Sequence, residues 1–414
     1  MSGYRNHMKL YKNLAEAVVK ALYSIFHDKM KADRVVEALL QSNKKWGSRD
    51  RRFVAKYIYD SVRWYRLYYE VGFDGNEPKT EADWWKLLAT AWVLDGIELP
   101  EWPELMGIDK DLIVQRNTDL HTKRVVYTSV PDWLDELGVK EFGEKLWTET
   151  IEALNLPAKV VLRVNTLKTT RPKLLDQLAR VSIEAKAFAD EHAIVLEEAR
   201  NLTQTQLYHD GCFEIQDYSS QQVVPFLNPR KGSVIVDACA GAGGKALHLA
   251  AWMQNRGFIK ALDIDEYKLK ELEKRAKRAS AEIITTQKLG KNGPIPLALH
   301  EVADYLLLDV PCSGTGVIRR NPDAKWKLSP EFIQDLVQTQ RHILTEYQKM
   351  LKPGAAMLYA TCSILPDENE RQVAWFLKET EIGKSFTLLK EKRIMPQDQG
   401  FDGFYMALLL KNKE

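Results

Sequence analysis

Hydrophobic positions recur with different periods in different parts of the chain. From about residue 8 to 135 they follow the spacing of one helix face, as at Leu14, Val18 and Leu22. This spacing predicts an all-α bundle, interrupted by a polar loop at 71–83.

Short β-rich runs replace the helical spacing from about 155 to 225, around one amphipathic stretch, "RPKLLDQLARV". That pattern is typical of a small α+β unit. From about 226 onward, strands such as "GSVIVDA" and "DYLLLDV" alternate with helical stretches, which predicts an α/β domain built on a parallel, doubly wound sheet. The sequence therefore predicts three domains, with bounds at 1–135, 136–225 and 226–414.

Composition narrows the class of protein. A chain of 414 residues that is 45% hydrophobic can bury more than one core. No apolar run reaches the length of a membrane span and the first residues lack the apolar core of a signal peptide, so we expect a cytoplasmic monomer with no membrane partner. The four cysteines form no CxxC pair and the histidines show no metal-binding spacing, so we expect neither a disulfide framework nor a metal site.

Positive charge is concentrated at the start of the chain. Residues 1–70 contain 15 Lys and Arg residues against 7 Asp and Glu residues, although the formal net charge of the whole chain is only +2. In "NKKWGSRDRRFVAKYIYDSVRWYRLYY" the basic residues are interleaved with aromatic ones, a mixture that suits phosphate contacts and base stacking on RNA. The alternative is a solvated helix whose aromatic side chains lie in the core.

A glycine-rich loop follows the first strand of the predicted sheet, in "DACAGAGGKALHLA" at 237–250. Asp263 ends the next strand, where a carboxylate can accept hydrogen bonds from both hydroxyls of a ribose. The loop matches neither GxGxxG nor the phosphate-binding GxxxxGK[ST], so a nucleoside without a phosphate chain, S-adenosylmethionine (SAM), is favoured over a dinucleotide or no ligand. The residues predicted to contact SAM are Cys239, Ala240, Gly241, Ala242, Gly243, Gly244, Lys245 and Asp263.

Two further stretches end an apolar strand with a thiol: "LLLDVPCSGTGVIRRNPDAKW" at 306–326 contains Asp309 and Cys312, and "MLYATCSILPDENE" at 357–370 contains Cys362. A single cysteine at a strand end is often only a small buried hydrophobe, but two such blocks indicate a site. Polar residues follow the first block and could either hold an RNA backbone, which we favour, or cap the next helix: Arg319, Arg320, Asn321 and Lys325.

These blocks together resemble a known family. The combination DACA-x-x-GGK, LLLD-x-PCSGTGVIRRNPD and YATCS-x-LP-x-EN is similar to the RsmB/Sun family of RNA cytosine-C5 methyltransferases across the whole C-terminal domain. The α+β unit resembles the family's small linker subdomain, and the basic helical part resembles the NusB-like RNA-binding domain of its ribosomal-RNA members. The resemblance implies a Rossmann-like SAM methyltransferase domain acting on RNA, with 16S ribosomal RNA the first expectation and tRNA the second.

The resemblance also implies roles for individual residues. In the strand order of this family the two thiols face one pocket; Cys362 matches the nucleophile that adds to C6 of cytosine, and Cys312 matches the thiol that assists product release. Asp309 matches an aspartate beside the target base and the cofactor. Lys245 matches a lysine that would favour the thiolate or orient the base.

The chain departs from the family pattern at two places. The glycine loop reads "AGAGGK" where the family usually has "AAPGGK", which predicts a more flexible loop. The segment "ITTQKLGKNGP" at 284–294 has no acid to bind adenosine, and Leu289 or a neighbour occupies that position. Either the adenine is held by apolar and backbone contacts, or SAM affinity is weakened. The second interpretation leaves open a non-catalytic RNA-binding ribosome assembly factor that keeps the fold.

Overall fold

The computed structural model describes residues 9–413 except 199 and 292. The chain divides into two compact units, each continuous in space but not in sequence. The first contains the residues up to Leu156 together with Ile318–Leu328, and the second contains Pro157–Val317 and the chain from Ser329 onward.

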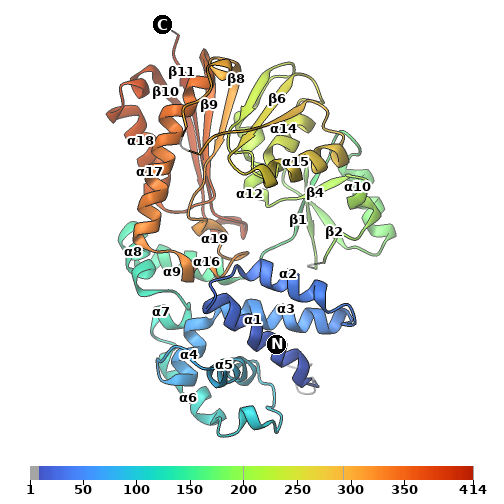
Figure 1. Ribbon diagram of the computed structural model, residues 1–414, viewed down its shortest axis with the longest axis vertical. Coiled ribbons are helices and arrows are strands. Elements are labelled where there is room, and N and C mark those ends of the chain that lie inside the picture. Colours follow the sequence, from blue (N-terminus) through green and yellow to red (C-terminus); the bar gives the residue numbers. More distant parts are fainter. Residues whose placement is uncertain (1–8, 199, 292, 414) are drawn as a thin grey trace. The chain divides into compact units, whose positions relative to one another are not determined.

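The first unit is helical, as predicted (Figure 1). A short 3₁₀ helix at Pro103–Leu105 and a single-turn helix in the inserted segment accompany the longer helices. Its α-helices are α1 (Lys12–Phe26), α2 (Ala32–Ser42), α3 (Ser48–Arg63), α4 (Tyr65–Phe73), α5 (Glu81–Leu94), α6 (Lys110–Leu120), α7 (Arg124–Tyr127), α8 (Asp132–Phe142), α9 (Glu144–Asn155) and α16 (Ala324–Lys327).

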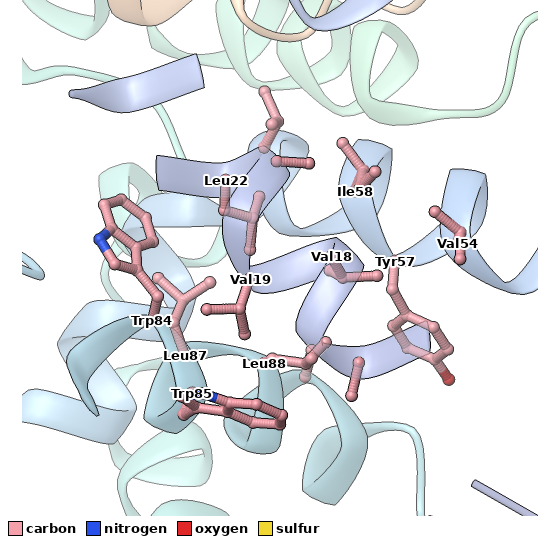
Figure 2. Packing of buried hydrophobic residues seen from close by; sticks show 14 of the residues in the cluster. Val18, Val19, Leu22, Val54, Tyr57, Ile58, Trp84, Trp85, Leu87 and Leu88 are labelled. Carbon is pink, nitrogen blue, oxygen red and sulfur yellow. The ribbon is translucent and has the colours of Figure 1, made fainter. Parts of the chain in front are cut away.

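Helices α1, α3 and α5 supply much of the core of this unit (Figure 2). Val18 and Leu22 of α1 are fully buried, as the spacing predicts. The polar loop is shorter than predicted, because α4 continues to Phe73 and α5 begins at Glu81. Thr80 fixes that beginning by accepting a hydrogen bond from the backbone N–H of Asp83 at 3.3 Å, an N-cap interaction.

The domain boundary expected after residue 135 falls inside α8. Arg124 donates to Asp135 from α7 at 2.9 Å, and Asn155 at the end of α9 donates to the carbonyl of Thr128 at 2.6 Å. These bonds attach α8 and α9 to the helices before them. The compact unit therefore ends at Leu156.

The second unit contains two sheets. The smaller one is antiparallel, with strand order β2-β3-β1-β4, as expected for the predicted α+β stretch. Its elements, with the helices that follow, are β1 (Val161–Val164), α10 (Arg171–Arg180), β2 (Ala185–Phe188), β3 (Ala193–Leu196), α11 (Gln206–His209), β4 (Phe213–Ile215), α12 (Tyr218–Gln221) and α13 (Val223–Leu227).

The larger sheet has seven strands in the order β10-β11-β9-β8-β5-β6-β7. Strands β5 to β9 are parallel, and the predicted strands are all present among them. The sheet is mixed, because β11, which the pattern did not predict, lies antiparallel between β9 and β10. The strands are β5 (Val234–Asp237), β6 (Phe258–Asp263), β7 (Ile284–Lys288), β8 (Ala303–Asp309), β9 (Leu351–Thr361), β10 (Phe386–Ile394) and β11 (Phe404–Lys411).

Helices cover both faces of this sheet (Figure 1). Successive residues of one strand point to opposite faces, so in β8 the side chain of Leu307 packs with α14 and α15, and that of Leu308 packs with α17 and α18. Because the helices lie on the two faces, the carboxyl ends of the parallel strands lead directly into loops. The helices are α14 (Gly244–Trp252), α15 (Glu266–Ala279), α17 (Pro330–Tyr347), α18 (Glu370–Glu379) and α19 (Pro396–Gln399), with 3₁₀ turns at Leu297–Leu299, Thr315–Val317, Gln348–Met350, Pro366–Glu368 and Ile382–Ser385.

Candidate functional site

Three loops of the second unit meet at the carboxyl edge of the large sheet. Strands β5, β8 and β9 are adjacent and parallel, and Asp309 at the end of β8 is paired with Ala360 near the end of β9. The glycine loop follows β5, the Cys312 loop follows β8 and the Cys362 loop follows β9. Ligands of open parallel sheets bind at this edge.

The two predicted catalytic thiols are in contact. The sulfur atoms of Cys312 and Cys362 are 3.4 Å apart, and both side chains are partly buried. The hydrogen bond with Cys362, together with burial, raises the pKa of Cys312 well above its ordinary value. Cys312 therefore holds its proton more tightly than an ordinary thiol, and either sulfur can be the donor of the hydrogen bond.

Lys245 and Asp309 form an ion pair beside the thiols. The ammonium of Lys245, in the first turn of α14, contacts the Oδ2 atom of Asp309. Burial lowers the pKa of Lys245, but the charge and hydrogen bond of Asp309 outweigh it and the pKa is raised on balance, with a further contribution from Cys362. Lys245 thus remains a cation close to Cys362, and a nearby cation favours a thiolate.

The glycine loop depends on glycine at one position above all. Gly243 has a φ of 87°, and a Cβ there would lie 2.5 Å from Cγ of Leu272, so a side chain would clash with α15. The backbone N–H of Gly241 donates to Oδ2 of Asp263 at 2.7 Å, and the N–H of Asp265 donates to Oδ1 at 2.8 Å. Asp263 therefore joins the loop to the end of β6, with further lone pairs of its carboxylate available for a ribose.

Two arginines hold this loop from outside, and the sequence analysis did not identify either. Arg163 on β1 donates to the carbonyl of Gly244 at 2.6 Å, and Arg275 on α15 donates to the carbonyl of Ala242 at 2.7 Å. Glu214 on β4 pairs with Arg275 at 2.8 Å. The loop that lacks the family's proline thus gains support from both the small sheet and α15.

A buried carboxylate was also missed, although it begins the glycine-loop block. Asp237 ends β5 and is 1% exposed, and neither of its carboxylate oxygens makes a hydrogen bond of normal geometry to the described part of the chain. Burial, followed by the charge of Asp309, raises the pKa of Asp237 to about 7. A signal was available, since a carboxylate at the end of an apolar strand is costly unless it serves a ligand.

These residues fit a nucleoside such as SAM. Asp237 offers two buried acceptor oxygens, and a Cβ added at Gly241 would meet nothing within 4 Å, so the backbone there has open space beside it. Leu289, at the position where the family has an acid, is buried, and its backbone N–H donates to the carbonyl of Asp263 at 2.9 Å. The Leu289 side chain packs in an apolar core of the sheet, at the position where the resemblance predicts a carboxylate.

The remaining cysteines are not part of the thiol pair. Cys212 is buried in the core of the small sheet. Cys239 in the glycine loop packs against the apolar core formed by the sheet with α17 and α18. Burial raises the pKa of Cys239 well above its ordinary value. No group of three His, Cys, Asp or Glu residues that could hold a metal ion occurs within the described residues, and none of the helices described is both long and apolar enough to cross a bilayer.

The segment predicted to touch RNA belongs to the helical unit. Lys325 is fully buried and donates to the carbonyl of Arg63 at 2.8 Å, and burial lowers its pKa well below the ordinary value. Arg319 is buried as well and donates to the carbonyl of Ala153 at 2.9 Å. The prediction of RNA contact is wrong for these two side chains in this conformation. For Arg320, which is half-buried, and Asn321, which is exposed, it stays a prediction.

Two protein-family models match the chain. One is described as 16S rRNA methyltransferase RsmB/F and matches residues 224–410, which include all three loops of the site. The other is described as the ferredoxin-like domain of RsmF/B-like methyltransferases and matches residues 130–203. The region that they cover runs from α8 to β11, with a gap between the two matches.

The curated relatives are named ribosomal RNA small subunit methyltransferase B. Ribosomal RNA small subunit methyltransferase B of Shewanella oneidensis is 36% identical over 293 residues, which cover 68% of this chain and 67% of the relative. The protein named probable ribosomal RNA small subunit methyltransferase B of Bacillus subtilis is 33% identical over 303 residues, or 69% and 67% of the two chains. The methyltransferase B of Yersinia pseudotuberculosis is 32% identical over 340 residues, which cover 78% of this chain and 77% of the relative.

Solved structures share the fold. The crystal structure of PH0851 has a TM-score of 0.80 at 23% identity and covers 97% of this chain and 99% of its own. NSun6 from Pyrococcus horikoshii with SFG, an analogue of SAM, has a TM-score of 0.62 at 20% identity. The match covers 69% of this chain and 99% of NSun6. A methyltransferase homologue from the same organism has a TM-score of 0.61 at 26% identity, over 70% and 97%.

Proposed function

Because the chain belongs to the RsmB/F family of 16S rRNA methyltransferases, we propose that it transfers the methyl group of SAM to C5 of a cytosine in 16S ribosomal RNA. A covalent bond between Cys362 and C6 of the base activates C5. The observation that carries this proposal is the 3.4 Å contact between the sulfur atoms of Cys312 and Cys362 at the edge that also holds the glycine loop.

SAM supplies an electrophilic methyl group. The chain holds the cofactor through the glycine loop, the carboxylate of Asp237 and the carboxylate of Asp263, which accepts hydrogen bonds from the ribose. The apolar surface of Leu289 meets the adenine in place of an acid. Arg163 and Arg275 keep the loop in position by binding its carbonyls.

Cys362 begins the reaction as the nucleophile. C5 of cytosine is a poor nucleophile, and a thiolate bonded to C6 turns the ring into an enamine-like species that can attack a methyl group. The ammonium of Lys245 stabilises the thiolate before attack. Asp309, held by Lys245, lies beside the base and assists proton transfer at N3 as electrons leave C6.

Cys312 completes the cycle as the base. After methyl transfer, the C5 proton must leave before the bond between Cys362 and C6 can break and release the thiolate. Cys312 contacts the Cys362 sulfur at 3.4 Å and so lies beside the adduct. It passes its own proton to solvent water and then, as a thiolate, accepts the proton from C5.

Exposed basic residues of the helical unit bind the RNA backbone. The structure separates the basic residues near the start of the chain into two groups, since Arg51 donates to the carbonyls of Leu40, Asn43 and Trp46 and therefore serves the fold. Arg63 is buried as well. Within residues 43–52 the exposed basic side chains are those of Lys44, Lys45, Arg49 and Arg52, and we assign the RNA contact to these four.

The reaction is tested by incubating the purified protein with SAM carrying an isotope-labelled methyl group and either 16S rRNA or tRNA. The RNA is digested to nucleosides, which are identified by mass spectrometry. Label in 5-methylcytidine from 16S rRNA is the expected result. Label in another nucleoside would contradict the C5 chemistry, and label from tRNA alone would contradict the substrate. The assay is carried out with naked 16S rRNA and, separately, with the small ribosomal particle as the substrate.

The second candidate is a non-catalytic RNA-binding assembly factor, and the observation that favours it is the apolar Leu289 in place of an adenosine-binding acid. Calorimetric titration with SAM separates the two functions. Micromolar binding of SAM is expected of the enzyme, whereas an absence of SAM binding in a protein that still binds 16S rRNA would favour the assembly factor.

A further inference from the structure

Two adjacent side chains lie buried beneath the cysteine loops, and no step of the chemistry above uses them. Glu368 ends the 3₁₀ turn after the Cys362 loop, and Asn369 directly precedes α18. Both are fully buried. A buried carboxylate is costly unless it is fully hydrogen-bonded, so its partners indicate its purpose.

Glu368 holds the residues on both sides of Cys312. Its Oε1 atom accepts a hydrogen bond from the backbone N–H of Ser313 at 2.8 Å, and its Oε2 atom accepts one from the Ser313 hydroxyl. The amide of Gln340 donates to the same Oε1 atom and to the carbonyl of Pro311, both at 3.0 Å. The Cys312 loop is thus fixed before and after the thiol.

Asn369 does the same for Cys362. Its Nδ2 atom donates to the carbonyl of Ser363 at 2.9 Å, and its Oδ1 atom accepts a hydrogen bond from the hydroxyl of Thr361. Because Glu368 and Asn369 are consecutive, one short stretch of backbone carries the supports of both loops.

Buried hydroxyl groups join the two loops directly. The hydroxyl of Ser363 is 3.3 Å from that of Ser313 and 3.0 Å from that of Thr315. The backbone N–H of Gly316 donates to the carbonyl of Cys362 itself at 2.9 Å. The two thiols therefore belong to one connected hydrogen-bond network, in which each member limits the movement of the others.

We propose that Glu368 and Asn369 are positioning residues that set the distance between the sulfur atoms of Cys312 and Cys362. The inference rests on the proposed function only in treating these thiols as the catalytic pair. Neither residue touches the reacting atoms; each acts through the loop that it holds.

Phenylarsine oxide measures this distance without RNA or SAM. Its arsenic atom forms two As–S bonds when two thiols lie close enough, and its oxygen leaves as water with the two thiol protons. The rate of bridging is followed by mass spectrometry of a digest, in which the peptides containing Cys312 and Cys362 become joined. The single thiols Cys212 and Cys239 provide no such pair.

We expect Glu368→Ala and Asn369→Ala each to slow bridging roughly tenfold, because each leaves buried partners unsatisfied and frees one loop. Glu368→Gln should restore most of the rate. Its amide oxygen can still accept from the N–H of Ser313 and from Gln340, while its amide nitrogen donates to the Ser313 hydroxyl.

Asn165→Ala is the matched control. Asn165 is also a buried asparagine whose amide donates to two backbone carbonyls, those of Gly211 and Ala279, both at 2.8 Å, but it lies in the small sheet's connections. This variant should lose thermal stability and bridge at the wild-type rate. Wild-type bridging in both Glu368→Ala and Asn369→Ala, or equal slowing in Asn165→Ala, would overturn the proposal.

The bridging test and the methylation test can fail separately. If the wild-type protein bridges rapidly and the variants do not, positioning holds even if no 5-methylcytidine is formed. If methylation is found and the variants bridge normally, the proposed function stands and the positioning role does not.

Discussion

Cys312 and Cys362 place their sulfur atoms 3.4 Å apart because the strands before them are parallel neighbours, with Asp309 paired to Ala360. The register brings the two loops to the same level of the sheet, and the hydrogen bond between the thiols makes the protonation of one depend on the other. Because Cys362 is proposed to attack the base and Cys312 to assist release, removal of each thiol should stop the reaction at a different step.

We expect Cys362→Ala to bind SAM and RNA without forming a covalent adduct, because the nucleophile is gone. Cys312→Ala should still attack and methylate but fail to release the product, since the base for C5 is missing. Denaturing electrophoresis with labelled RNA detects the trapped species. A trapped adduct in Cys362→Ala instead would move the nucleophile to Cys312, and normal turnover by Cys312→Ala would remove its role.

Arg275→Ala should lower the affinity for SAM by about 1 kcal/mol, because the carbonyl of Ala242 loses a hydrogen bond that holds the glycine loop. Arg278→Ala is the matched control, since Arg278 also pairs with Glu214 but packs its guanidinium over the ring of Tyr208, 3.9 Å from the ring centroid. Calorimetry with SAM measures both variants. An equal loss of affinity in the two would assign the effect to Glu214 and not to the loop.

Asp263→Ala should weaken SAM binding by roughly 1.5–3 kcal/mol, as expected for the loss of a charged hydrogen bond. In Asp263→Asn the side chain keeps one acceptor for the N–H of Gly241, so the loop is retained and the ribose is held less tightly. Its affinity should lie between those of wild type and Asp263→Ala. Unchanged affinity in Asp263→Ala, by calorimetry, would exclude the residue from the site.

Asp237 should contribute less to the stability of the SAM-free protein as the pH rises from about 4 to 7. The pKa of Asp237 is raised from 3.8 to about 7 in the folded protein, so in this window the folded state binds more protons than the unfolded state. The free energy of unfolding then decreases with pH, by up to ~4 kcal/mol from this group. Asp237→Asn should remove this part of the slope in urea unfolding; identical slopes would contradict the assignment.

Alanine substitution of Lys44, Lys45, Arg49 and Arg52 together should weaken RNA binding and reduce the slope of log affinity against log salt by roughly one for each phosphate that is no longer neutralised. SAM affinity should be unchanged. Lys173→Ala, an exposed lysine on α10, is the control and should alter neither quantity. Retention of the full salt slope by the fourfold variant would show that the RNA follows another surface.

The parts of the fold that could be predicted are those set by local pattern. The helical spacing of α1 and the apolar strands β5, β6, β8 and β9 each carry their own signal, and the parallel order of β8 and β9 puts both thiols at one edge. The antiparallel pair β10 and β11 was missed. The connection at 395–403 holds the clue, because it is too short for a crossover between parallel strands.

The supports of the site could not be predicted, because they depend on interactions between distant parts of the chain. Arg163 and Gly244 are 81 residues apart in sequence, and Arg275 lies 33 residues after Ala242. Lys325 follows the Cys312 block and has several basic residues near it in sequence, so it resembled an RNA-binding residue. Its burial against Arg63 follows only from the packing of the inserted segment.

That inserted segment has a consequence for how the protein is made. The helical unit needs Ile318–Leu328, in which the Nε1 atom of Trp326 donates to the carbonyl of Val62 at 2.7 Å. At ribosomal rates of roughly 5–20 residues per second, these residues emerge about 10–30 s after Leu156. The helical unit therefore waits, incomplete, until strands β5 to β8 of the large sheet have been synthesised.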